Sequence, residues 1–136
     1  MDMDKTEAVM ASSRKAVWVG WALSGLVALM FGFSAFLKIK GGPELDQGMV
    51  HLGLPASMVK PLAILELTCL AIYLIPPTAV LGAILLAGYV GGTIVTHWRS
   101  GDPFIVNIIL GLVLWLAIYL REPRLKELIP IRRSTK

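Results

Sequence analysis

A single carboxylate, Glu66, lies in the middle of the apolar stretch PLAILELTCLAIYLIPP, residues 61–77. A carboxyl group can accept or donate a proton and can accept hydrogen bonds, so it is able to bind a polar ligand or to move a proton. If the stretch crosses a bilayer, an ionised carboxylate at its centre costs at least about 2.5–3.5 kcal/mol. We therefore expect Glu66 to be protonated, to be paired with another side chain, or to face a wet cavity.

Five other polar side chains lie toward one end of the apolar segments and are candidate partners of Glu66. Ser34 and Lys38 lie near the end of the segment 16–38, Thr93 and His97 lie near the end of the segment 78–98, and Asn107 lies near the start of the segment 103–120. Because short connections make consecutive helices antiparallel neighbours, these positions fall on one side of a bilayer. We predict a polar pocket that opens on that side, in which Glu66, Lys38, His97, Asn107 and Thr93 contact a ligand.

Each of these side chains also has a simpler interpretation. Lys38 can snorkel to the interface, and its depth, about half a span above Glu66, does not establish a direct ion pair. His97 can be an interfacial residue, although a histidine can also carry protons near neutral pH. Asn107 can join two helices by hydrogen bonds, and His51 has no evident partner. Two isolated histidines predict no metal site, and we assign no catalytic residue.

The composition is typical of one small membrane domain. Hydrophobic residues make up 56% of the 136 residues and charged residues only 16%, whereas soluble domains have about a quarter charged. So short a chain could not enclose a soluble core of that size. The single cysteine, Cys69, excludes an internal disulfide. The net charge of +4 comes from Lys and Arg residues that flank the apolar segments, so we expect contact with the lipid bilayer and no nucleic-acid binding.

Four segments have the character of transmembrane helices, which need about 20 apolar residues. We predict spans over about 16–38, 56–75, 78–98 and 103–120, arranged as an all-α four-helix bundle within residues 16–120. Residues 1–15 form a polar cytoplasmic tail and residues 121–136 a basic cytoplasmic tail. The second span must begin near Ala56 to be long enough to cross, and this places Pro61 inside it. Residues 76–77 and 100–103 contain prolines that predict tight turns.

The longer connection between the first two spans predicts one further short helix. Pro43 suits its first turn, Gly53 suits its end, and three apolar residues fall on one face: Leu45, Met49 and Leu52. We predict that this helix lies at the membrane surface or caps the bundle.

Charge and small residues predict orientation and packing. Nine of the 13 Lys and Arg residues lie in 1–15 and 121–136, and four lie between 38 and 99. Since the excess faces the cytoplasm, we predict a protein of the cell (inner) membrane with both termini cytoplasmic and the polar pocket facing outward. Small residues four positions apart predict close helix packing, either inside the bundle or between copies in a homo-oligomer: Gly20, Ser24, Ala28 and Gly32 in the first span, and Ala83, Ala87 and Gly91 in the third.

Three stretches resemble the DoxX and DoxX-like family of small membrane proteins. The end of the first span, FSAFLKIKG, is similar to the Lys-Gly exit of that family's first helix. The stretch LELTCLAIYLIPPTAVLGAILL resembles the family's second-to-third helix unit, and HWRSGDP resembles its third-helix exit. The likeness covers roughly residues 20–121 and implies a four-helix integral membrane protein. By position, Lys38, Glu66 and His97 carry over as site residues.

The resemblance also implies a link to membrane redox systems, because the family's namesake is associated with a thiosulfate:quinone oxidoreductase. The first hypothesis is therefore a subunit that binds a quinone or another lipid-soluble ligand around Glu66, with His97 as a proton relay and a redox partner subunit carrying the redox centre. No GxGxxG motif follows a strand, so we expect neither an autonomous enzyme nor an intrinsic cofactor. Two alternatives stay open: a structural or assembly protein without a ligand, and a small proton-coupled transporter.

Overall fold

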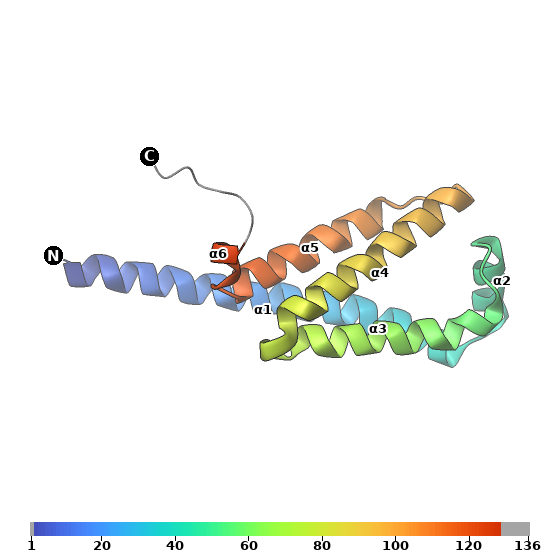
Figure 1. The fold of residues 1–136 in the computed structure, drawn as a ribbon, viewed down its shortest axis with the longest axis horizontal. Coiled ribbons are helices and arrows are strands. Elements are labelled where there is room, and N and C mark those ends of the chain that lie inside the picture. Colours follow the sequence, from blue (N-terminus) through green and yellow to red (C-terminus); the bar gives the residue numbers. More distant parts are fainter. Residues whose placement is uncertain (1, 129–136) are drawn as a thin grey trace.

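The computed structural model describes residues 2–128, and all regular structure in that range is helical (Figure 1). In chain order the elements are α1 (Asp2–Lys40), α2 (Pro43–His51), the 3-10 turn η1 (Ala56–Met58), α3 (Val59–Leu74), the 3-10 turn η2 (Pro76–Thr78), α4 (Ala79–Ser100), α5 (Ile105–Arg121) and α6 (Leu125–Leu128). The prediction of an all-α chain is therefore confirmed for residues 2–128. Half of the predicted tail 121–136, residues 129–136, lies outside them.

Among the described residues, three helical stretches are long and apolar enough to cross a membrane: Met3–Lys40, Ala56–Leu74 and Pro76–Ser100. The fourth predicted span corresponds to α5, an apolar helix of 17 residues. At 1.5 Å per residue α5 is about 26 Å long, a little short of the roughly 30 Å of bilayer hydrocarbon. The helices α3, α4 and α5 thus overlap three of the predicted apolar segments within a few residues, and α1 contains the fourth; that all four cross the membrane stays a prediction.

α1 is longer than the predicted first span. It runs for 39 residues from Asp2, so that the predicted polar tail continues the same helix. No glycine or proline occurs before Gly20 to interrupt it. Residues 3–15 are exposed, and Figure 1 shows this part of α1 reaching beyond the other helices.

The start of the second apolar stretch differs in detail from the expectation. The 3-10 turn Ala56–Met58 leads into α3, which itself begins at Val59. Pro61 therefore lies in the first turn of α3 and not in its interior. The first four N–H groups of an α-helix have no partner within the helix, so the missing N–H of Pro61 removes no hydrogen bond there.

The four long helices pack in a closed order. α1 packs against α3 and α5, and α4 packs against the same two helices. Buried apolar side chains fill the space between them, among them Val27, Phe31, Leu70, Leu86 and Leu114. The outer surface is also apolar, since Phe33, Ile64 and Leu112 are each more than 60% exposed. A continuous apolar surface of this kind fits a lipid solvent and not water.

Two glycines allow the helices to approach closely. A Cβ on Gly82 of α4 would lie 2.2 Å from the backbone nitrogen of Tyr73 in α3, and a Cβ on Gly20 of α1 would lie 2.6 Å from the backbone nitrogen of Arg121 in α5. By contrast, Gly32 and Gly91 have no neighbouring atoms within 4 Å of such a Cβ. Of the small residues that predict close helix packing, only some therefore lie at contacts between helices of one chain.

α2 forms where the sequence predicts a short helix. Pro43 is its first residue, and Leu45, Met49 and Leu52 lie on its more buried side, with Met49 fully buried. Figure 1 shows α2 at the end of the molecule opposite α6 and the amino-terminal part of α1. We call these the α2 end and the α6 end. The location of α2 at a membrane surface stays a prediction.

Candidate functional site

Glu66 and Lys38 form an ion pair between α3 and α1. Lys38 Nζ donates a hydrogen bond to Glu66 Oε2 at 2.8 Å, and the two side chains are 15% and 2% exposed. The ion pair, which the depths of the two residues in the sequence did not establish, is thus present. Of the three states expected for Glu66, the structure shows the one in which it is paired with another side chain.

The direction of the two helices explains how these residues meet. In an α-helix each Cα–Cβ bond tilts toward the helix N-terminus. α1 and α3 run in opposite directions (Figure 1), and Lys38 lies near the C-terminal end of α1. The Lys38 side chain therefore leans back toward the middle of the bundle, while Glu66 leans toward the α2 end. The long lysine side chain covers the remaining distance.

Two further polar groups complete what we call the Lys38–Glu66 cluster. Ser34, one turn before Lys38, accepts a second hydrogen bond from Lys38 Nζ. Tyr89 of α4 interacts with the Glu66 carboxylate through its phenol group. The Tyr89 ring is in turn held by an edge-on contact with Phe31, whose ring centre is 6.1 Å away. The cluster therefore draws on three helices: α1, α3 and α4.

The other three predicted site residues lie outside this cluster. Thr93 donates its hydroxyl hydrogen to the carbonyl oxygen of Val90 in its own helix, 2.7 Å away. Asn107 is half-buried in α5, and no hydrogen-bond partner of its side chain lies within residues 2–128. His97 is directed to the α4–α5 turn, where its Nδ1 is 3.7 Å from Asp102 Oδ2.

A separate group of side chains joins α2 to the α4–α5 turn. His51 Nε2 lies 3.0 Å from Asp102 Oδ1, so the expectation that His51 has no partner is wrong. Arg99 donates to the carbonyl oxygen of Leu52 at 2.6 Å, just after α2. Asp102 can approach α2 because Gly101 turns the chain with a φ of +78° at the end of α4. Within residues 2–128 no three His, Cys, Asp or Glu side chains form a group that could hold a metal ion.

Comparison with known proteins gives the same assignment as the motifs. The model of the DoxX-like family matches residues 22–120. The chain belongs to the DoxX-like family. No curated protein and no solved structure matches it. The matched range of this DoxX-like protein holds the whole Lys38–Glu66 cluster, and it runs from the middle of α1 almost to the end of α5. Family and apolar helices together make it an integral membrane protein.

Sequence reasoning missed a second buried charge in the DoxX-like protein, Arg121 at the end of α5. Only 6% of this residue is exposed, although the sequence suggested a charge of the basic tail. Its guanidinium donates to Ser24 Oγ at 3.1 Å and to the carbonyl oxygen of Tyr73. It also lies 4.3 Å from the ring centre of Trp21. Trp21 and Ser24 lie in the middle of α1 and Tyr73 lies near the end of α3, so only the packing of these helices brings the three residues to Arg121.

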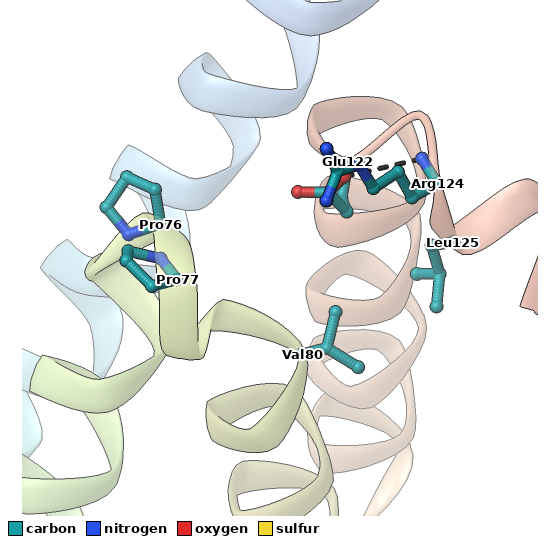
Figure 2. Close-up of a pocket in the computed structure, with 6 residues that line it drawn as sticks. All are labelled: Pro76, Pro77, Val80, Glu122, Arg124 and Leu125. Atoms are coloured by element: carbon teal, nitrogen blue, oxygen red, sulfur yellow. Dashed lines mark hydrogen bonds between the residues drawn. The ribbon is translucent and has the colours of Figure 1, made fainter.

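Within residues 2–128, two of the cavities lie away from the Lys38–Glu66 cluster. One, of about 440 Å³, lies at the α6 end between η2 and the α5–α6 connection (Figure 2). The other, of about 140 Å³, is an apolar groove between α1 and α5 lined by residues such as Val27, Met30 and Leu110. Neither cavity is lined by a residue of the cluster, so the predicted outward pocket around Glu66 stays a prediction.

Proposed function

We propose that this DoxX-like protein is a four-span bundle of the cell membrane with both termini in the cytoplasm. In this proposal it is a subunit of a membrane redox system and binds the polar head of a quinone, or of a similar lipid-soluble ligand, at the Lys38–Glu66 cluster. The observation that carries the proposal is the buried Lys38–Glu66 pair itself.

Stability alone gives little reason to keep such a pair. Taking two charges out of water costs several kcal/mol for each ion, and apolar side chains of similar volume are often as stable or more stable. In the bilayer interior, ionisable side chains are rare and commonly mark sites of binding or proton transfer. The pair is therefore better explained by a function than by folding.

The chemistry of the cluster suits a ligand with carbonyl or hydroxyl groups. A lysine ammonium has three N–H donors. Within the described residues, Lys38 donates one hydrogen bond to Ser34 and one to Glu66. A third N–H can donate to a quinone carbonyl oxygen. The second oxygen of Glu66 can accept a hydrogen bond from the hydroxyl group of a reduced quinone. The ligand would approach from the side of Lys38, whose side chain is the more exposed of the two.

The chemistry of quinones determines what this protein and its partner subunit would each supply. Reduction of a quinone to its dihydroxy form takes two electrons and two protons. In the proposal the partner subunit supplies the electrons. Lys38 and Glu66 hold the ligand. The Lys38 ammonium donates one proton to a quinone oxygen atom, and water donates the second proton and reprotonates Lys38.

The burial of Glu66 also favours a second candidate, a structural role without a ligand. Only 1% of Glu66 is exposed, and the charge of Lys38 is already matched. In this case the pair would act as a specific link between α1 and α3 that fixes how these helices assemble.

Small molecules carried through purification distinguish the two functions. We would purify the wild type, Glu66→Gln and Lys38→Met from the same membranes and measure quinones in the extracts by mass spectrometry. Glu44→Gln and Lys40→Met are matched controls, because Glu44 and Lys40 are exposed residues of the same types.

For a ligand site we expect a quinone in the wild type and in both controls, and a loss of about tenfold or more in the two cluster variants. A charge-assisted hydrogen bond contributes about 1.5–3 kcal/mol, and this corresponds to a tenfold or larger change in affinity. Size-exclusion profiles show whether the variants are folded. Equal quinone contents in folded wild type and variants would contradict the ligand proposal and support the structural role.

A further inference from the structure

The cavity at the α6 end lies where the helices meet the membrane surface. η2 joins the end of α3 to the start of α4, and the α5–α6 connection lies beside it (Figure 2). The cavity measures about 440 Å³, and its lining combines apolar and charged residues: Pro76, Pro77, Val80, Glu122, Arg124 and Leu125. In a membrane protein a cavity at the ends of spanning helices is at the depth of lipid headgroups.

The cavity presents one negative and one positive side chain, both from the α5–α6 connection. Glu122 Oε1 accepts a hydrogen bond from the backbone N–H of Arg124 at 3.3 Å, which holds the carboxylate near this turn. Neither Glu122 nor Arg124 forms an ion pair within residues 2–128. Arg121 attracts Glu122 at longer range, but its guanidinium is hydrogen-bonded to Ser24 and Tyr73. The Glu122 carboxylate and the Arg124 guanidinium are therefore both available to a ligand.

We propose that this cavity binds the headgroup of an ethanolamine phospholipid. The Arg124 guanidinium would donate hydrogen bonds to the lipid phosphate, and the Glu122 carboxylate would accept them from the lipid ammonium group. Val80 and Leu125 provide apolar contacts for the glycerol and the first carbons of the acyl chains. The site is independent of the Lys38–Glu66 cluster at the other end of the molecule.

The adjoining face of α4 offers a path for an acyl chain. Ile84 lies one turn beyond Val80 on the same face and is 55% exposed, and Gly88 lies one turn further. A Cβ at Gly88 would have no neighbour within 4 Å, so the surface there is open. A lipid can thus place its headgroup in the cavity and one chain along α4.

The two charges, on Glu122 and Arg124, select among phospholipids. An ethanolamine headgroup carries N–H donors on its ammonium group, whereas a choline headgroup carries methyl groups that cannot donate to Glu122. A glycerol headgroup has no cation at all, so it leaves Glu122 unmatched beside a negative phosphate. We therefore expect ethanolamine lipid to bind more tightly than either choline or glycerol lipid.

The test is lipid retention by the full chain in bilayer nanodiscs that contain equal parts of ethanolamine, choline and glycerol phospholipids with the same acyl chains. Native mass spectrometry of the released protein would count each lipid that remains bound. The variants are Glu122→Gln and Arg124→Gln. The controls are Glu127→Gln and Arg14→Gln, because both residues are exposed and neither lines the cavity.

We expect the wild type and both controls to retain about fivefold more ethanolamine than choline lipid, as an exposed ion pair contributes up to about 1 kcal/mol. Glu122→Gln should remove this preference, and Arg124→Gln should lower the retention of all three lipids. Equal retention of the three lipids by the wild type, or an unchanged preference in Glu122→Gln, would overturn the proposal. Soluble phosphoethanolamine should not displace the bound lipid at millimolar concentration. Full displacement would assign the site to a soluble headgroup compound instead.

Discussion

At the scale of single residues, both buried charges of the described chain are held by groups from other helices. Glu66 is paired with Lys38 across α1 and α3. Arg121 has no carboxylate within salt-bridge distance in residues 2–128 and is held by Ser24, a carbonyl oxygen and two aromatic rings. An arginine can be stabilised in this way because its planar guanidinium donates to several acceptors and stacks on aromatic faces. The lysine ammonium, a compact point charge, requires the carboxylate.

The first prediction concerns the Lys38–Glu66 pair. Removing one partner leaves a buried charge unmatched, so Lys38→Met should lower the free energy of unfolding by about 3 kcal/mol. The double variant Lys38→Met/Glu66→Leu should recover most of this loss, because no charge is then left in the interior. Unfolding in mixed detergent micelles, followed by circular dichroism, measures both values.

Lys40→Met is the matched control for this prediction, since Lys40 is exposed and lies two residues along the same helix. It should change the free energy of unfolding by less than about 0.5 kcal/mol. If the effects of Lys38→Met and Glu66→Leu simply add in the double variant, the two side chains are not coupled and the pair does not form in the membrane protein.

At the scale of elements, two helices approach most closely where a glycine leaves no side chain between them. α3 and α4 are joined by a tight turn and approach each other at Gly82, while α1 and α5 approach at Gly20. In lipid there is little hydrophobic drive for helices to associate, so backbone contact at small residues contributes much of the packing energy. The exposed glycines of α4, such as Gly88, do not take part in this contact.

The second prediction compares two glycines of α4. Gly82→Ala would place a Cβ 2.2 Å from the backbone of Tyr73, so we expect a loss of about 1–3 kcal/mol in the free energy of unfolding. Gly88→Ala meets no atom within 4 Å and should be neutral or stabilising by up to about 1 kcal/mol, since alanine favours the helix. Thermal unfolding of the purified variants gives the comparison. Equal destabilisation by both changes would show that α3 and α4 do not approach at Gly82.

At the scale of the whole molecule, the polar groups of the interior fall into two layers. The Lys38–Glu66 cluster lies toward the α2 end and the Arg121 group toward the α6 end. Between them lies an apolar layer that contains Val27, Phe31, Leu70 and Leu86. Charge movement across such a layer is costly. This arrangement favours a binding or structural role over a proton-coupled transporter.

The third prediction concerns orientation in the membrane. In a Cys69→Ala background, Asp46→Cys in α2 should react with a membrane-impermeant maleimide added to intact cells. Glu127→Cys in α6 should react only after the cells are permeabilised. The reason is the excess of Lys and Arg in residues 1–15 and 121–136, because such an excess commonly marks the cytoplasmic side of a membrane protein. The opposite labelling pattern would reverse the proposed orientation and would place the Lys38–Glu66 cluster near the cytoplasm.

The sequence by itself determined the helices of this DoxX-like protein and most of their limits. Long apolar runs, prolines and glycines act locally, and a helix in lipid must satisfy its own backbone hydrogen bonds, so the element follows directly from the run. The short helix α2 followed from Pro43, Gly53 and the apolar face between them in the same way. The motif order was also local information, and it led to the correct family.

The tertiary structure decided which polar side chains meet. Lys38 and Glu66 come together because their helices are antiparallel and their side chains lean toward each other, a relation between helices that spacing along one helix does not contain. Thr93 and His97 were both predicted beside Glu66. Thr93 instead donates a hydrogen bond within α4, and His97 lies at the α4–α5 turn with its Nδ1 3.7 Å from Asp102 Oδ2. The sequence suggests that Arg121 is a surface charge, but in the structure it is enclosed by α1 and α3. Sequence determines the depth and type of each residue, but contact across helices depends on their relative rotation, and packing alone sets that rotation.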